Sequence, residues 1–184
     1  MADTAIDLSA QRAHPLVGVV FAAAGVALTL APDAYRVNLR AKPDAAGALS
    51  KALGVDLPTA PKTSASAGTR TALWLGPDEW LIYDTKANPV DALSGKDVLH
   101  SAVDISHRNT AILVSGPSAA DVVNGGCPQD LSLASFPVGA ASRTVLGKAE
   151  IVLHRVKPTV FRVEVWRSFS RYAFDLLEAA ARDV

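Results

Sequence analysis

Apolar and polar positions along the chain fall into short periodic segments that predict strands. Residues 35–40 read YRVNLR, in which Tyr35, Val37 and Leu39 would share one face and the three polar residues the other. A period of two is typical of a half-buried strand. Further apolar or alternating runs predict strands at residues 26–30, 71–75, 80–83, 98–105, 111–114, 143–146, 150–156 and 160–166.

Four segments carry helical spacing or helix-ending signals. Pro43 and Gly54 mark the start and the stop of a helix, because proline fits the first turn and glycine ends helices readily. Shorter helices are expected at residues 88–93 and 118–123, and residues 57–69 are expected to form a mobile surface loop. The chain closes with a predicted amphipathic helix at residues 169–182, whose apolar face would be Phe169, Tyr172, Ala173, Leu176, Leu177 and Ala180.

The order strand, helix, paired strands and a further helix or strand occurs twice along the chain. Such repetition predicts an α+β fold of pseudo-repeated, ferredoxin-like plaits, in which antiparallel sheets carry helices on one face. We therefore expect one domain over residues 1–184. It would comprise a loose arm at 1–15, of the kind that lies on a partner in a subunit, a first half at 16–105 and a second half at 106–184.

The composition narrows the class of protein. Hydrophobic residues make up 49% and charged residues 20%, which fits a globular chain rather than a disordered one. Eighteen basic and eighteen acidic residues give zero net charge, so no electrostatic argument favours nucleic acid or an anionic membrane. The single cysteine, Cys127, favours a reducing cytoplasm. The uncharged run Leu16–Ala31 is shorter than the roughly 20 residues of a membrane-spanning helix, and we interpret it as core.

No constellation in the sequence assigns a catalytic, cofactor-binding or metal-binding residue. Asp104 and His107 would lie on opposite faces of a continuing strand, and no nucleophile is identifiable nearby. We prefer the interpretation that Asp104 and Ser106 bond the turn backbone while His107 and Arg108 face a partner. Cys127 follows a helix C-terminus, whose dipole disfavours a reactive thiolate, so packing is expected. The four histidines lack ligand spacing, and no glycine-rich dinucleotide loop occurs.

Aromatic and basic residues near the end of the chain indicate a contact surface. Trp166 shares the polar side of its strand with Arg162 and Glu164, and large aromatics beside arginine are typical of interface centres. Packing of the tryptophan in the core is the alternative. The expected partner-contact set is His107, Arg108, Trp166 and Arg167.

Several motifs of the sequence occur together in one order. They read LWLGPDEWLIY at 73–83, DISHRN at 104–109, NGGCPQDL at 124–131, FPVG at 136–139, RTVLGKAEI at 143–151 and FRVEVWRSF at 161–169. Together these motifs resemble the gamma subunit family of heterotetrameric sarcosine oxidase, a small relative of the folate-binding fold of the glycine-cleavage aminomethyltransferase.

The resemblance implies a function inside a complex. The whole enzyme would demethylate sarcosine oxidatively to glycine, with tetrahydrofolate as one-carbon acceptor and hydrogen peroxide as product. FAD, FMN, NAD and tetrahydrofolate would be bound by the larger subunits, and this chain would be a small non-catalytic subunit docked on the large alpha subunit. The alternatives are a free-standing tetrahydrofolate-binding, aminomethyltransferase-like protein and the equivalent subunit of an oxidase for another N-methylated amine.

Six basic residues in the last third bear on the folate alternative. A basic groove would suit the glutamate tail of folate. The aminomethyltransferase pattern, however, holds the pterin with an acidic pair after a Gly-Gly turn, whereas the hairpin at 146–150 reads LGKAE. In the other interpretation these cations lie on solvent faces of strands and pair with Glu150, Glu164 and Asp175. The six are Arg143, Lys148, Arg155, Arg162, Arg167 and Arg171.

Overall fold

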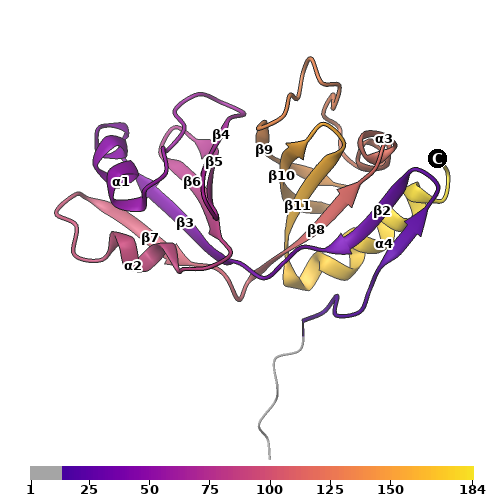
Figure 1. Ribbon diagram of the computed structural model, residues 1–184, viewed down its shortest axis with the longest axis horizontal. Coiled ribbons are helices and arrows are strands. Elements are labelled where there is room, and N and C mark those ends of the chain that lie inside the picture. Colours follow the sequence, from indigo (N-terminus) through magenta and orange to yellow (C-terminus); the bar gives the residue numbers. More distant parts are fainter. Residues whose placement is uncertain (1–13) are drawn as a thin grey trace, which may run out of the picture.

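Two antiparallel sheets stand side by side, and each carries its helices on the face turned away from the other (Figure 1). The computed structural model describes residues 14–184. The arm expected at residues 1–15 therefore lies outside the described residues except for its last two positions. The fold class expected from the sequence, an α+β arrangement of antiparallel sheets with helices on one face, is confirmed.

The first sheet holds five strands in the order β4-β5-β6-β3-β7. Asn88 caps the short helix α2 by accepting a hydrogen bond from the Val90 amide at 3.1 Å, and Gly54 ends α1 in the left-handed region at φ 68°. The elements are β3 (Tyr35–Ala41), the 3₁₀ turn η1 (Pro43–Ala45), α1 (Ala46–Leu53), β4 (Ser64–Ala67), β5 (Arg70–Gly76), β6 (Glu79–Asp84), α2 (Pro89–Leu93) and β7 (His100–Asp104).

The second sheet holds six strands in the order β1-β2-β8-β11-β10-β9. Its helices α3 and α4 cover the outer face, and neither they nor any other helix within residues 14–184 has the length and apolar content to cross a membrane. The elements are β1 (Phe21–Ala23), β2 (Val26–Leu30), β8 (Asn109–Ser115), α3 (Ala119–Asn124), β9 (Ala141–Leu146), β10 (Ala149–Lys157), β11 (Val160–Trp166), the 3₁₀ turn η2 (Arg167–Phe169) and α4 (Ser170–Ala181).

The two sheets follow one plan, but the second borrows a strand from the start of the chain. In the first sheet β3 pairs with β6 on one side and with β7 on the other; in the second, β8 pairs with β11 and with β2. The hairpin of β1 and β2, here called the N-terminal hairpin, thus takes the position that β7 takes in the first sheet. The sequence-based assignment of residues 16–105 to the first half therefore differs from the structure at residues 21–30, because pairing with β8 places them in the second sheet.

Each sheet has its own outer core, and a third, smaller core joins the two. The face of the first sheet that packs on α1 and α2 includes Val37, Leu39 and Trp80, whereas the second packs on α3 and α4 through Val163 and Phe161. The joining core, here called the seam, contains Leu73, Leu81, Tyr83, Ile105, Ala141 and Val152. The sheets therefore cover each other over the central part of their inner faces.

The segment 57–69 is not the mobile surface loop expected from its composition. Leu57 is buried in the first outer core, and residues 64–67 form the edge strand β4. The Ser64 hydroxyl donates to the Gly139 carbonyl at 2.6 Å, and the Ala141 amide donates to the Lys62 carbonyl at 3.3 Å. Contacts with the other half thus order a segment whose own side chains carry little apolar signal.

The closing helix α4 buries most of the predicted face, with Leu176 and Ala180 packed at its margin, but the buried face is rotated away from the two predicted aromatic positions. Ala173 and Leu177 are buried as expected, but Phe174 is fully buried and Phe169 and Tyr172 are exposed. Both sets of positions satisfy helical spacing, so the choice between them depends on where the helix lies against β2, β8 and β11. The exposed aromatic side chains are left on the surface beside the end of β11.

Candidate partner interface

Trp166 ends strand β11 at the margin of the seam, where the other sheet no longer covers it. It pairs with Asn109 at the start of β8, and 39% of its surface is exposed. The Arg108 guanidinium carbon lies 5.2 Å from the centre of the indole ring, and the Phe169 ring meets it edge-on at 6.4 Å. A cation on an aromatic face and an aromatic edge contact both hold the indole in one orientation at the surface.

The turn before β8 brings the other expected contact residues to the same place. The amides of Arg108 and Asn109 both donate to the Ile105 carbonyl, and the Arg167 amide donates to the Arg108 carbonyl at 2.8 Å. His107 and Arg108 are exposed, whereas Arg167 is half-buried. The structure therefore places His107, Arg108, Trp166 and Arg167 on two touching segments.

Sequence reasoning missed two aromatic members of this surface. Phe169 and Tyr172 are 42% and 40% exposed, and the Tyr172 hydroxyl accepts a hydrogen bond from the Lys148 amide at 3.1 Å. The signal that could have revealed them is their proximity in sequence to Trp166. We call the group Arg108, Trp166, Phe169 and Tyr172 the aromatic ridge.

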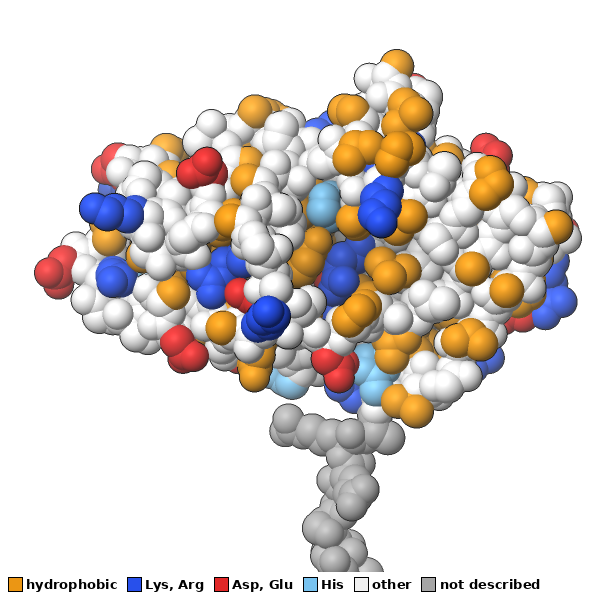
Figure 2. All heavy atoms as spheres, in the orientation of Figure 1, with side chains coloured by type: hydrophobic (Ala, Val, Ile, Leu, Met, Phe, Trp, Pro, Cys, Tyr) orange, Lys and Arg blue, Asp and Glu red, His pale blue; other side chains and the backbone are white. Residues whose placement is uncertain are grey.

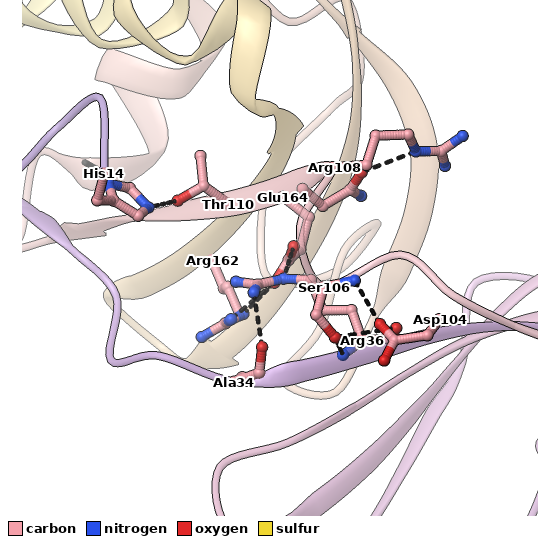
Figure 3. Close-up of polar contacts among 10 residues, drawn as sticks. His14, Ala34, Arg36, Asp104, Ser106, Arg108, Thr110, Arg162 and Glu164 are labelled. Carbon is pink, nitrogen blue, oxygen red and sulfur yellow. Dashed lines mark hydrogen bonds and ion pairs between the residues drawn. The ribbon is translucent and has the colours of Figure 1, made fainter. Parts of the chain in front are cut away.

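The preferred interpretation of Asp104 and Ser106 agrees with the geometry of the turn. The Ser106 amide donates to Asp104 Oδ1 at 2.8 Å, and the Arg36 amide donates to Ser106 Oγ at 2.8 Å (Figure 3). Partial burial opposes ionisation of the Asp104 carboxyl, but hydrogen bonds from Ser106 and Asn88 outweigh it and lower its pKa. These bonds fix the turn that presents His107 and Arg108.

Two polar residues of β11, Arg162 and Glu164, are buried between the sheets, contrary to the expectation that the cations of this strand lie on a solvent face. Glu164 is fully buried and receives Arg36 Nε on Oε2 and Arg162 Nη2 on Oε1, each at 2.7 Å (Figure 3). Arg162 also lies 4.4 Å from the centre of the Tyr83 ring. The pairing with Glu164 was foreseen, but the burial was not, because the first sheet covers this face.

His154 lies in the same seam. Its Nδ1 is 3.3 Å from the Tyr83 hydroxyl, and its Nε2 is 3.2 Å from Ser64 Oγ. Burial lowers the pKa of His154 to about 4, and the nearby Arg162 adds to the effect, so the ring is neutral at pH 7. Burial also disfavours the charged form of Tyr83, which raises the pKa of its hydroxyl. These side chains connect the sheets by neutral hydrogen bonds.

The remaining candidates from the sequence lie apart from one another. Cys127 is buried in the second outer core, as expected for a packing residue. Arg143, on β9 of the second sheet, pairs with Glu79 of the first sheet at 2.5 Å, and Asp104 and His107 take no part in this pair. Within residues 14–184, no group of three or more His, Cys, Asp or Glu side chains is placed to hold a metal ion.

The model of the family described as "Sarcosine oxidase, gamma subunit family" matches residues 38–183, which run from within β3 to beyond the end of α4 and include the aromatic ridge. The chain belongs to the sarcosine oxidase gamma subunit family. This family assignment confirms the resemblance inferred from the motifs.

Relatives within the gamma subunit family are similar over most of their length. The sarcosine oxidase gamma subunit of Corynebacterium sp. (strain U-96) is 35% identical over 92% of this chain and 90% of its own length. The gamma subunit of Arthrobacter sp. is 36% identical over 71% of each chain. The similarity therefore extends over nearly the whole protein and is not limited to one motif.

Solved structures agree with the fold. A chain of the heterotetrameric sarcosine oxidase from Corynebacterium sp. U-96, solved in complex with pyrrole 2-carboxylate, matches with a TM-score of 0.85 and 28% identity over 94% of this chain and 95% of that one. The glycine-cleavage aminomethyltransferase T of Bartonella henselae matches with a TM-score of 0.61 and 15% identity, over 83% of this chain and 45% of that one. The second likeness concerns the fold alone.

Proposed function

We propose that this chain is the small, non-catalytic gamma subunit of a heterotetrameric sarcosine oxidase. The complex would convert sarcosine to glycine by oxidative demethylation, pass the one-carbon unit to tetrahydrofolate and release hydrogen peroxide. FAD, FMN, NAD and tetrahydrofolate would be bound by the larger subunits, and the reducing cytoplasm suggested by the single cysteine would be its location. Near-complete coverage of a gamma subunit relative carries the proposal.

The surface that would dock on the large alpha subunit is the one built around Trp166. The expected contact residues His107, Arg108, Trp166 and Arg167 lie on touching segments; Phe169 in η2 packs on Trp166, and Tyr172 in the first turn of α4 is a further exposed aromatic side chain. Tryptophan, tyrosine and arginine are the residues that dominate interface energetics when a partner removes their remaining water. The stacked Arg108 and Trp166 are already oriented, so docking orders few additional rotamers.

Co-expression of the four subunits with a tag on the alpha subunit tests this proposal. We expect Trp166→Ala or Arg108→Glu to reduce the amount of this chain recovered with the alpha subunit, with affinity falling about tenfold or more. Leu99→Ala is the matched control because Leu99 is 81% exposed beside β7, at the far end of the first sheet. Thermal melting of each purified variant separates loss of docking from loss of folding.

Two results would contradict the proposal. If the Trp166→Ala variant, the Leu99→Ala variant and the wild type were recovered equally with the alpha subunit, the surface around Trp166 would not be the docking surface. Sarcosine turnover or stoichiometric flavin in the purified chain alone would contradict the non-catalytic assignment.

A second function, tetrahydrofolate binding by the free chain, is suggested by the fold shared with aminomethyltransferase T. Titration of the isolated chain with tetrahydrofolate by calorimetry distinguishes it from the first. Micromolar binding would favour a free-standing folate-binding protein. The absence of a binding heat at micromolar tetrahydrofolate would favour the role of a non-catalytic subunit. The choice between sarcosine and another N-methylated amine would reside in the flavin subunit, so substrate profiling of the assembled complex addresses it.

A further inference from the structure

A cavity of about 420 Å³ lies where the chain passes between the two sheets, and we call it the crossing cavity. Its walls come from the connection between β2 and β3, the residues after β6, the turn before β8, and the single side chains of His14 and Arg167. Arg36, Asn109 and Thr110 on these walls are buried. Separate segments thus converge on one space of a size typical for small ligands.

The charges around the crossing cavity are predominantly positive. Arg36, Lys86 and Arg167 line it, whereas Asp33 is the one carboxylate among the described lining residues. Glu164 is shared by Arg36 and Arg162, so these three residues keep one net positive charge, and Lys86 adds a second against the single negative charge of Asp33. On the face shown in Figure 2, basic side chains lie among apolar ones along the line where the two halves meet. A partly enclosed space with this balance favours an anionic occupant.

The polar groups of the cavity are held in place before any ligand arrives. Arg36 Nε binds Glu164 at 2.7 Å, and its Nη1 donates to the Ala34 carbonyl at 2.9 Å, which fixes the guanidinium plane (Figure 3). His14 Nε2 lies 2.5 Å from Thr110 Oγ1. Burial lowers the pKa of His14 and the charge of Arg167 adds to this, so its ring is a neutral hydrogen-bonding group at pH 7.

Lys86 supplies a cation at the crossing cavity that has no ion-pair partner among residues 14–184. Its side chain is exposed at the mouth of the crossing cavity, and it takes part in none of the ion pairs formed within residues 14–184. Its amide, by contrast, donates to Asp84 at 2.9 Å, which anchors the backbone there. A mobile ammonium on an anchored backbone can close over a bound anion while Arg36 forms the fixed wall.

We propose that the crossing cavity binds a small anionic molecule that carries carboxylate or phosphate groups. Arg36 and Lys86 would provide the charge, and Ser106 and Thr110 the hydroxyls, for its oxygen atoms. Neither the aromatic ridge nor docking on a partner is needed for this binding. The inference therefore goes beyond the proposed function and can fail independently of it.

The test uses the purified full chain at constant ionic strength and pH 7. Succinate and inorganic phosphate are titrated separately, with binding followed by calorimetry and by amide chemical shifts of the ¹⁵N-labelled protein. We expect saturable binding of one probe with shifts concentrated at Lys86, Ser106 and Thr110. The probe that binds identifies the preferred oxyanion.

Two substitutions of opposite sign and one control sharpen the test. Lys86→Gln removes a charge-assisted hydrogen bond and is expected to weaken binding about tenfold. Asp33→Asn removes the one competing carboxylate and is expected to strengthen binding severalfold. Lys148→Gln, at the exposed β9–β10 turn, changes the net charge equally and is expected to leave the affinity unchanged.

Three outcomes would overturn the proposal. The first is no saturable binding of either probe up to about 10 mM, a range in which specific sites are distinguishable from bulk salt. The second is an equal loss of affinity in the Lys86→Gln and Lys148→Gln variants, which would indicate unspecific attraction. The third is that shifts at Ser106 and Thr110 occur only on adding the alpha subunit, which would assign the cavity to an acidic side chain of the partner.

Discussion

Glu164 is the carboxylate at the centre of a buried cluster of three charged residues. Its carboxylate is fully buried and joins Arg36 of the first sheet to Arg162 of its own strand. The buried carboxylate pairs with both arginines, and removing its charge leaves two like charges in a water-poor region. The pair also fixes the first sheet against the second at one point.

We predict that Glu164→Gln lowers the free energy of unfolding by about 3 to 5 kcal/mol. Urea unfolding at pH 7 measures the change. The matched control is Asp175→Asn, which removes an exposed carboxylate paired with Arg171 at 2.9 Å and is expected to shift stability by less than about 0.5 kcal/mol. A Glu164→Gln variant as stable as this control would contradict the structural role of the buried pair.

His154 makes the stability depend on pH in a defined window. Its pKa is about 4 in the folded protein and 6.5 when unfolded, so between these values the unfolded chain binds a proton that the folded protein does not. We expect stability to fall as the pH drops from about 6.5 to 4, with His154 contributing about 3 kcal/mol of the loss. Urea midpoints measured across this range in the wild type and in His154→Gln give the difference.

Carboxylates such as Asp84 add a loss of their own at lower pH, because their folded pKa values are depressed. The comparison of wild type with His154→Gln isolates the histidine, and His107→Gln serves as a surface control that retains the profile produced by His154. Parallel curves for wild type and His154→Gln between pH 6.5 and 4 would show that the buried ring is not the source.

At the level of elements, two glycines in the second sheet hold the N-terminal hairpin close to α3. Gly25 turns the hairpin at φ 91°, and Gly116 follows β8 at φ 126°. A Cβ at Gly116 would lie 2.2 Å from the Gly25 carbonyl oxygen, which is backbone and cannot move aside. The close approach of two backbones therefore requires glycine.

Gly116→Ala is expected to destabilise the protein by about 2 kcal/mol or more, because it adds backbone strain to a steric clash. Gly47→Ala is the matched control, since Gly47 lies in α1 with no neighbour within 4 Å of a new Cβ. That substitution is expected to stabilise the protein by about 0.5 to 1 kcal/mol. Thermal melting of both variants measures the contrast, and two melting temperatures that fall by the same amount would count against the clash.

Periodicity in the sequence predicted the elements well where each depends on its own residues. The strand β3 and the stop at Gly54 are local properties, and both were predicted correctly, although Tyr35 is exposed and Arg36 is buried in contrast to the expected faces. Strand β4 was missed because the sequence SASA carries little pattern, and hydrogen bonds with the second half give it its place. Similarly, Phe174 instead of Tyr172 is buried in α4 because the position of the sheet decides between two faces of equal spacing.

The site was predicted in part for the same reason. His107, Arg108, Trp166 and Arg167 were grouped from their residue types, and they are adjacent because antiparallel pairing aligns the start of β8 with the end of β11. The burial of Arg162 was not predictable from alternation. A period of two tells which side chains share a face, but it does not tell whether water or a second sheet covers that face.

At the level of the whole molecule, the seam makes two similar halves into one unit. The joining core includes Leu81 and Tyr83 from the first sheet and Val152 from the second, and Arg36 binds Glu164 across it. Burial of this apolar area would be lost if one half unfolded alone. The halves should therefore unfold together.

We predict that native-state hydrogen exchange gives the same maximal opening free energy for the Val37 amide in β3 and the Ile112 amide in β8. Leu81→Ala, in the seam, is expected to lower both values equally, by about 2 to 5 kcal/mol. Distinct plateaus for the two strands, or a loss confined to the first sheet in the Leu81→Ala variant, would show that the halves are independent.

The borrowed strand also has a consequence for the chain while it is being made. β2 ends at Leu30 and its partner β8 begins at Asn109, so roughly 80 residues must emerge between them, which takes about 4 to 16 seconds at ribosomal speed. During that interval the strands of the first sheet are synthesised, whereas β2 lacks its partner β8 and its apolar side chains have no second core to pack on. Chaperones that shield nascent chains would meet this protein at its N-terminal hairpin first.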